Sequence, residues 1–109
     1  MAQYMLLYRG PARPLENFPA EQVQAQMRAW ARWTDQLSSA LLSLGEPFGV
    51  RSALTGDGSD VPVTELNGYS VIEAETISHA RSLCAGHPYL DGESGTFVIE
   101  IFELTPMGR

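Results

Sequence analysis

The chain of 109 residues carries seven basic and thirteen acidic side chains, a formal net charge of −6 at pH 7, and a hydrophobic fraction of 44%. This length and composition are typical of a globular domain, and we expect a single domain over residues 1–109. Because the few basic residues form no cluster, the charge balance argues against binding to nucleic acid or to an anionic membrane surface.

The cysteine content and the N-terminal sequence indicate in which cellular compartment the protein is expected. Cys84 is the only cysteine, which excludes an internal disulfide and favours a reducing compartment. The first residues, MAQYMLLYRG, lack the features of a secretory signal, and no run approaches the ~18 apolar residues that span a bilayer. We therefore expect a cytoplasmic protein that is not embedded in a membrane.

The N-terminal part of the chain predicts a strand followed by a long helix. Residues 3–9 (QYMLLYR) are apolar, rich in strand formers and followed by a Gly-Pro pair, which indicates a strand buried on both faces. A proline at position 19 suits the first turn of a helix, and Gly45 suits its end. Between them, seven residues spaced alternately four and three positions apart predict one helix face: Val23, Met27, Trp30, Thr34, Leu37, Leu41 and Leu44.

The remainder of the chain predicts three strand segments and a second helix. Residues 46–56 (EPFGVRSALTG) indicate a strand, 57–60 (DGSD) a turn, and 61–67 (VPVTELN) a short return arm that Pro62 confines to a sheet edge. Residues 68–75 (GYSVIEAE) predict another strand, after which Thr76 caps a shorter helix that Gly86 and Pro88 end. Residues 96–104 (TFVIEIFEL) alternate between two faces and form the clearest strand pattern.

This order of elements predicts an α+β fold of the ferredoxin-like βαββαβ kind, with an antiparallel sheet and both helices on one face. The strands carry apolar residues on both faces, as Leu6 and Tyr8 against Met5 and Leu7 illustrate. Two helices cover only one face, so the other needs a second cover. We expect another copy of the sheet, related by a two-fold axis, to provide it in a homodimer.

Several segments together resemble the YCII-related domain, including its relatives named for an Asp-Gly-Pro-Phe motif: YMLLYRG, the helix with AWARW, GEPFGV, LNGYSVIEAETISHA, GHPYL and IEIFELTPM. The resemblance covers nearly the whole chain and implies a ferredoxin-like domain that pairs into a dimeric α+β barrel. It also implies a small enzyme of the isomerase, lyase or dehydrochlorinase type that acts on cyclic or aromatic compounds through a histidine and an aspartate. Relatives encoded beside alternative sigma factors imply a regulatory role instead.

The chain departs from this family at the positions that carry its chemistry. The family's histidine on the first helix falls near Ala29 and Trp30, and no histidine occurs from residue 10 to 78. His-Pro stands at 87–88 where many relatives have Asp-Pro or Cys-Pro, and DGSD stands at 57–60 where others have Asp-Gly-Pro-Phe. Acid/base chemistry must therefore rest on His87, or the chain is a non-catalytic small-molecule-binding or regulatory module.

His87 has two interpretations. Gly86 and Pro88 hold it in extended backbone beside the end of the second predicted helix, where a protonated imidazole would complement the helix dipole. Alternatively, it is a loop histidine placed for proton transfer, since the unperturbed pKa of imidazole suits acid/base work near neutrality. His79 is expected to face solvent.

Glu100 lies on an otherwise apolar strand face and needs a partner there. Arg51 or Arg9 can pair with it, or the carboxylate can hold or deprotonate a ligand. The candidate catalytic residues are therefore His87 with Glu100, or His87 with an aspartate of the predicted hairpin, Asp57 or Asp60.

Aromatic residues supply the candidate ligand contacts. Trp30 lies on the predicted helix face and is expected to pack, whereas Trp33 lies off its centre and is expected to line a cleft between helix and sheet. Tyr69 and Tyr89 can stack on a planar ligand. With Arg51, these three residues are the candidate binding residues. We expect no metal or cofactor, since neither a nucleotide-binding loop nor zinc-type His/Cys spacing occurs.

Overall fold

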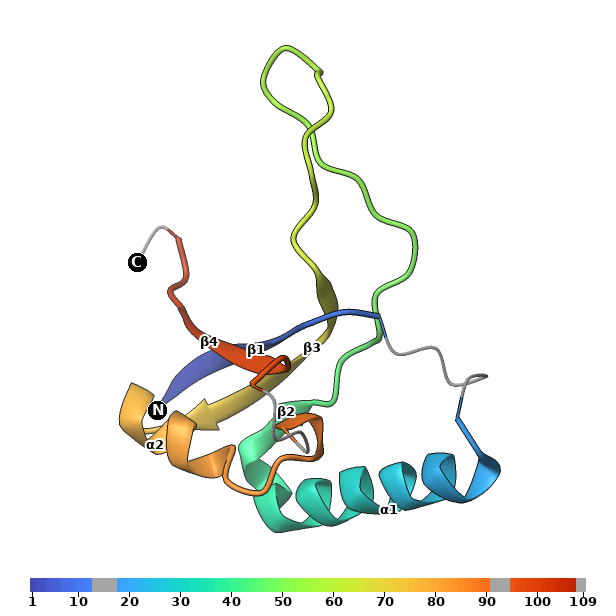
Figure 1. The fold of residues 1–109 in the computed structure, drawn as a ribbon. Coiled ribbons are helices and arrows are strands. Elements are labelled where there is room, and N and C mark those ends of the chain that lie inside the picture. The colour runs from blue at the N-terminus through green and yellow to red at the C-terminus, as the bar shows by residue number, and fades with distance from the viewer. Residues whose placement is uncertain (13–17, 91–94, 108–109) are drawn as a thin grey trace.

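A computed structural model gives the structure of the protein and describes residues 1–12, 18–90 and 95–107. Its elements follow in the order β1 (Ala2–Arg9), α1 (Ala20–Leu37), η2 (Ser38–Ala40), β2 (Leu41–Ser43), β3 (Leu66–Ala74), α2 (Ile77–Leu83), η3 (Pro88–Leu90) and β4 (Val98–Leu104), where η marks a 3₁₀ helix. The four strands form one antiparallel sheet in the order β2-β3-β1-β4 (Figure 1). This is the ferredoxin-like α+β arrangement, so the predicted fold class is confirmed.

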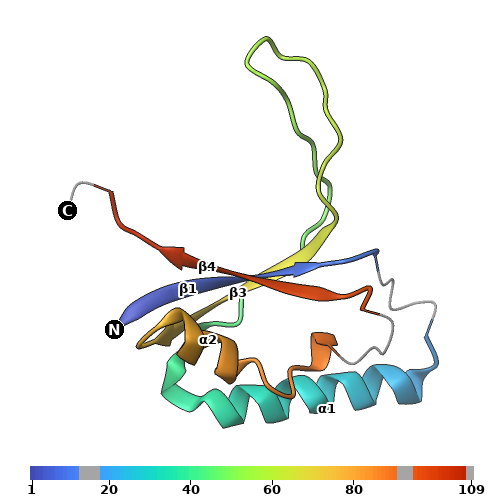
Figure 2. The ribbon, with the colours of Figure 1, turned by 60° about the vertical axis from the view of Figure 1, so that its left-hand side comes forward.

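Both helices lie on the same face of the sheet, as two views of the ribbon agree (Figures 1 and 2). Alternate residues of β1 and β3 point towards the helices and are buried, as the period of two in a strand requires. The core between sheet and helices consists of Tyr4, Leu6, Tyr8, Trp33, Leu37, Ile72, Ala74, Ala80, Cys84 and Tyr89.

The opposite face of the sheet, which we call the open face, is also largely apolar. In the strand register, Met5 lies between Val71 and Phe102, and Leu7 lies between Tyr69 and Glu100. Figure 2 shows both helices on the other side of the sheet, and no helix of the described chain lies over this face. Phe102 keeps 52% of its surface exposed. An apolar sheet face of this extent is typical of an interaction surface.

The end of the first helix was predicted wrongly. α1 ends at Leu37, and the chain then turns through Ser38, a non-glycine residue with φ of +52°, into η2 and the short strand β2. β2 pairs with β3 at Ile72 and Val71. Leu41 is half-buried against the core, so it belongs to the inner side of a strand and not to a helical stripe. Spacing alone cannot separate these interpretations for a short apolar run.

The strand predicted at 46–56 is also wrong. Residues 46–65 form an arm that leaves the sheet on the side away from the helices (Figures 1 and 2). Its only β-contacts in the described chain are the isolated bridges Pro47 to Gly68 and Leu54 to Asp60. The composition favours a strand, but strand residues are stabilised by neighbouring strands, and the arm has none along most of its length. The turn predicted at 57–60 is confirmed by the bridge that closes it and by the φ of +86° at Gly58.

The remaining boundaries agree with the sequence to within about two residues, the usual uncertainty at element ends. Thr76 caps α2 as predicted, because its side chain accepts a hydrogen bond from the His79 N–H at 3.0 Å. Gly86 follows α2 with φ of +74°, a conformation that favours glycine. Within residues 1–12, 18–90 and 95–107, no helix is long and apolar enough to cross a membrane.

Candidate functional site

His87 is buried beneath the sheet, with only 2% of its surface exposed. Gly86 turns the chain at the end of α2, the His87 N–H donates to the Cys84 carbonyl at 3.0 Å, and Pro88 starts η3. This tight local path directs the imidazole into the core. His87 thus follows the helix end as predicted, but the prediction of a protonated ring on the helix dipole was wrong, because the ring is buried and burial disfavours its charged form.

Aromatic rings surround the imidazole. Its centroid lies 5.1 Å from that of Tyr8, 4.8 Å from that of Trp30 and 4.2 Å from that of Trp33. Tyr89 packs against Tyr8 with centroids 5.0 Å apart. The rings come from β1, α1 and η3, so the tertiary fold assembles an aromatic enclosure that no single segment contains.

The hydrogen bonds of His87 determine its tautomer. Nδ1 lies 3.0 Å from the main-chain nitrogen of Tyr89, whose N–H can only donate, so Nδ1 is the acceptor. In a neutral ring the proton then resides on Nε2, which lies 3.1 Å from the Tyr8 hydroxyl and donates to it. Tyr8 in turn donates to Ser70 Oγ at 2.6 Å, and Ser70 donates to the Leu44 carbonyl at 2.7 Å. We call this the His87–Tyr8–Ser70 chain.

Burial keeps His87 and Tyr8 of the His87–Tyr8–Ser70 chain neutral. Desolvation lowers the pKa of His87 from 6.5 to about 4, so the ring is uncharged at pH 7. Desolvation also raises the pKa of the Tyr8 phenol, although the hydrogen bond with Ser70 opposes this shift. Since Nδ1 accepts a hydrogen bond and Nε2 carries the proton, the imidazole as placed offers no vacant lone pair to a substrate.

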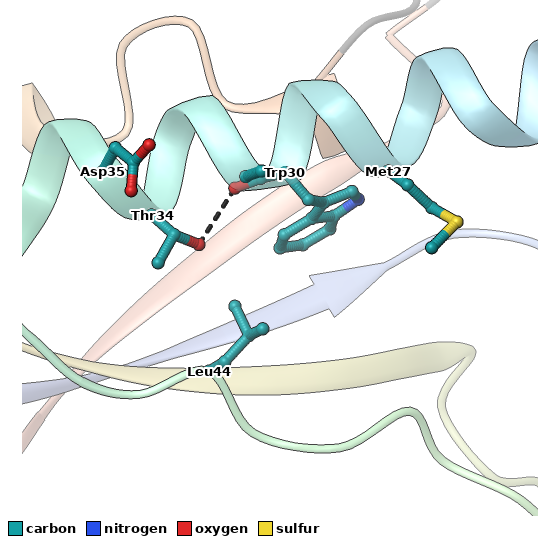
Figure 3. A pocket seen from close by; sticks show the side chains of 6 residues that line it. Met27, Trp30, Thr34, Asp35 and Leu44 are labelled. Carbon is teal, nitrogen blue, oxygen red and sulfur yellow. Dashed lines mark hydrogen bonds between the residues drawn. The ribbon is translucent and has the colours of Figure 1, made fainter.

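A groove of about 410 Å³ opens beside this region, between α1 and the residue that follows β2 (Figure 3). We call it the α1–β2 groove, and it is lined by Met27, Trp30, Ala31, Thr34, Asp35 and Leu44. Its volume falls within the range of small-molecule sites, and most of its wall is apolar. Trp30 contacts both the groove and the buried His87, since their rings pack edge to face.

Glu100 lies on the open face, on the other side of the sheet from His87. Its carboxylate forms an ion pair with Arg9 at 2.5 Å, and both side chains are partly exposed. Arg9 is one of the two predicted partners. The other, Arg51, donates instead to the main-chain carbonyls of Phe48 and Leu66, so it holds the base of the arm. Within one chain, the structure does not bring Glu100 and His87 together.

Asp57 and Asp60 lie at the tip of the arm. The Asp57 carboxylate accepts hydrogen bonds from the Thr55 hydroxyl and, at 3.0 Å, from the Ser59 N–H. These bonds lower the pKa of Asp57 from 3.8 to about 2, and the bond from Thr55 contributes most. The arm projects away from the helices, so these aspartates and His87 are not brought together within one chain (Figures 1 and 2).

The candidate ligand contacts are dispersed. Trp33 lies in the core, where its indole N–H donates to the Leu83 carbonyl at 3.1 Å and so ties α1 to α2. Tyr89 is buried, and its hydroxyl accepts from Asn67 at 2.8 Å. Tyr69 lies on the open face and stacks on Phe48, with centroids 5.8 Å apart. None of these residues lines the α1–β2 groove.

Sequence reasoning missed Tyr8 and Ser70 as partners of His87. The period of two does place both residues on the helix-facing side of their strands. Their contact depends on the register of β1 against β3, in which Ser70 lies opposite Leu6. No short-range pattern carries that register. It follows from the pairing of segments far apart in the chain.

The described residues show no metal-binding cluster: no group of three or more His, Cys, Asp or Glu side chains among them is placed to hold an ion.

Neither a protein-family model nor a curated protein matches this chain. Among solved structures, the chain is similar to 5-chloro-2-hydroxyhydroquinone dehydrochlorinase (TftG) from Burkholderia phenoliruptrix AC1100, in a complex with 2,5-dihydroxybenzoquinone. The TM-score is 0.53 with 16% sequence identity, over 94% of this chain and 93% of that chain. At this identity the similarity supports the ferredoxin-like fold and leaves the chemistry to be argued from the residues of this chain.

Proposed function

We propose that this protein binds a small cyclic or aromatic compound in the α1–β2 groove. The observation that carries the proposal is the groove itself, which combines a volume of about 410 Å³, an apolar wall and the exposed part of one indole. Planar apolar ligands bind in such sites by burying their faces against aromatic and aliphatic side chains. TftG, which has a similar fold, carries the planar ring compound 2,5-dihydroxybenzoquinone in its complex.

An acid/base enzyme acting on the same class of compound is the second candidate. It is favoured by the His87–Tyr8–Ser70 chain, whose histidine contacts the groove residue Trp30. Catalysis by His87 requires that Trp30 move aside and that one ring nitrogen exchange its present partner for the substrate. A binding function requires neither change, so binding is the function that the geometry supports best.

The homodimer expected from the sequence is part of the proposal. The open face presents Met5, Leu7, Val71 and Phe102 in adjacent rows without a covering helix. A second copy of the same face would bury these rows in a sheet-on-sheet core, as aligned sheets do in sandwiches. The Arg9–Glu100 ion pair leaves Glu100 with a partner when water is removed from the face.

A thermal-shift screen tests the groove. Cyclic ketones, quinones, phenols and aromatic carboxylates, with 2,5-dihydroxybenzoquinone among them, are added to the purified protein, and a compound that binds the folded state raises its Tm. Leu44→Ser is expected to reduce the rise because Leu44 lines the groove. Leu42→Ser is the matched control, since Leu42 lies in β2 two residues before Leu44 and is similarly exposed but does not line the groove.

The outcomes separate the two candidate functions. If no compound raises the Tm of the wild type, or if both leucine variants respond alike, the groove is not the binding site. For a compound that binds, its conversion is followed by NMR in the wild type and in His87→Gln. Turnover that depends on His87 while binding is retained favours the enzyme, and a bound compound that stays unchanged favours the binding protein.

A further inference from the structure

The two tryptophans of the chain lie on the same helix and differ in the state of their indole nitrogens. The N–H of Trp33 is used inside the fold, where it donates to the Leu83 carbonyl. The N–H of Trp30 makes no hydrogen bond within the part of the chain that the structure describes. Every buried side-chain nitrogen and oxygen among those residues has a partner, so the Trp30 N–H must be accessible to solvent.

This unpaired donor belongs to the α1–β2 groove. Figure 3 shows the Trp30 indole extending from α1 towards Leu44, with its nitrogen at the Met27 end of the groove. The hydroxyl of Thr34, the other neutral polar group of the lining, already donates to the Trp30 carbonyl at 2.9 Å. Asp35 lies at the opposite end from Met27 along α1 and has no hydrogen to donate when ionised. Trp30 is thus the groove's unengaged side-chain donor.

We propose that the Trp30 N–H selects the ligand, which is a planar cyclic compound carrying an uncharged acceptor oxygen, such as a ketone, quinone or phenol. This inference rests on the proposed binding function and adds the polar contact that the apolar wall cannot supply. An apolar wall discriminates weakly between ligands of equal shape, whereas a donor that must be desolvated disfavours a ligand without an acceptor. The carboxylate of Asp35 and the net charge of −6 disfavour anionic ligands at the same site.

A matched pair of probes isolates this contact. Indanone and indane have nearly the same planar ring system, and only indanone carries a carbonyl oxygen. The wild type is expected to bind indanone roughly tenfold more tightly than indane. Indanone accepts a hydrogen bond from the Trp30 N–H, whereas indane leaves that donor without a partner and away from water. Binding is measured by NMR titration, and the Trp30 indole N–H resonance is expected to move with indanone.

Trp30→Phe keeps an aromatic ring in the groove and removes the N–H, so the preference for indanone over indane is expected to fall to within about twofold of unity. Trp33→Phe is the control: it removes the N–H that bonds Leu83 and is expected to lower the Tm while leaving the preference intact. The ratio of the two affinities is insensitive to a partly unfolded sample, because both probes meet the same folded fraction.

An unchanged preference in Trp30→Phe would overturn this inference while leaving the groove as a binding site. A loss of preference in Trp33→Phe that equals the loss in Trp30→Phe would also overturn it, since the effect would then not belong to the groove. If neither probe shifts the resonances of groove residues in the wild type, this inference fails, and the thermal-shift screen decides the proposed function separately.

Discussion

The side chains of Tyr8 and His87, 79 positions apart in the sequence, meet in the core with Tyr8 Oη 3.1 Å from His87 Nε2. The contact extends through Ser70 to the carbonyl of Leu44, so four separate segments are joined by one series of buried hydrogen bonds. Since Leu44 also lines the α1–β2 groove, the series connects the histidine with the wall of the candidate site. A fully satisfied buried network of this kind favours one arrangement of the core over alternatives.

Tyr8→Phe is expected to lower the free energy of unfolding by about 1–3 kcal/mol. The change removes one hydroxyl and leaves His87 Nε2–H without its acceptor in the core, and Ser70 Oγ loses a donor. Tyr4→Phe is the matched control, because Tyr4 is equally buried and its hydroxyl bonds no residue among those described. We expect the control to change stability by less than about 0.5 kcal/mol in urea unfolding. Equal losses in the two variants would contradict the role of the network.

The lowered pKa of His87 predicts a pH-dependent stability. The unfolded chain binds a proton near pH 6.5 and the folded chain only near pH 4, so the fold favours the neutral ring. The contribution is complete above pH 6.5 and is lost as the pH falls towards 4. The shift corresponds to a loss on the order of 3 kcal/mol across that window.

His87→Gln isolates this effect, because glutamine does not titrate and the carboxylates of the chain remain. The slope of unfolding free energy against pH between 4 and 6.5 is expected to be flatter in the variant than in the wild type. His79→Gln is the control for removing a histidine as such, since His79 lies on the surface of α2 and outside the core. A wild-type slope in His87→Gln would show that the buried imidazole is not the titrating group.

The open face is the interface of the proposed dimer. Phe102→Glu places a charge on that face, on the edge strand β4 beside Met5, and is expected to weaken association by on the order of a hundredfold or more, because each protomer of an isologous pair contributes one buried charge. Ile77→Glu is the matched control: Ile77 is 51% exposed, against 52% for Phe102, but it lies on α2.

Sedimentation at micromolar concentration measures the association. The wild type and Ile77→Glu are expected at twice the protomer mass of 11.9 kDa, and Phe102→Glu at the protomer mass. A wild type that sediments as a stable 11.9 kDa species would contradict the proposed dimer. Dissociation by Ile77→Glu but not by Phe102→Glu would indicate an interface on the helical side of the sheet instead.

Local patterns predicted the fold well where an element has a signal of its own. The cap at Thr76, the positive φ at Gly86 and the alternation in β4 all depend on a few neighbouring residues. The same reasoning failed from Leu41 to the arm, because apolar residues there fit both a helix face and a strand. Leu41 forms a strand and not a helix turn because it pairs with Ile72 of β3, a contact that the sequence of β2 does not encode.

The candidate site was predicted only in part. His87 was singled out from its residue type and its loop, yet its environment comes from rings on β1 and α1. Glu100 was expected to need a partner, and Arg9 is that partner. The α1–β2 groove escaped prediction because its walls are ordinary apolar residues, brought together only after α1 ends early and β2 joins the sheet edge.

Gly45 lies close against β3 at the β2 edge of the sheet, and a substitution there tests this packing. It follows β2 with φ of +77°, and a Cβ added there would lie 1.8 Å from the main-chain oxygen of Tyr69 in β3. Gly45→Ala therefore combines an unfavourable backbone conformation with a clash that no side-chain movement can relieve, and a loss of more than about 3 kcal/mol is expected in urea unfolding. Gly49→Ala in the arm meets nothing within 4 Å and is expected to be neutral or slightly stabilising.

The consequence of Gly45→Ala extends to the groove, because Leu44 immediately precedes the glycine and its carbonyl accepts from Ser70. If the variant folds, its β2 edge must shift from Tyr69, and the indanone preference and the Ser70 bond are expected to weaken together. A variant with wild-type stability would contradict the close approach of Gly45 to β3, and with it the place of Leu44 in the wall of the groove.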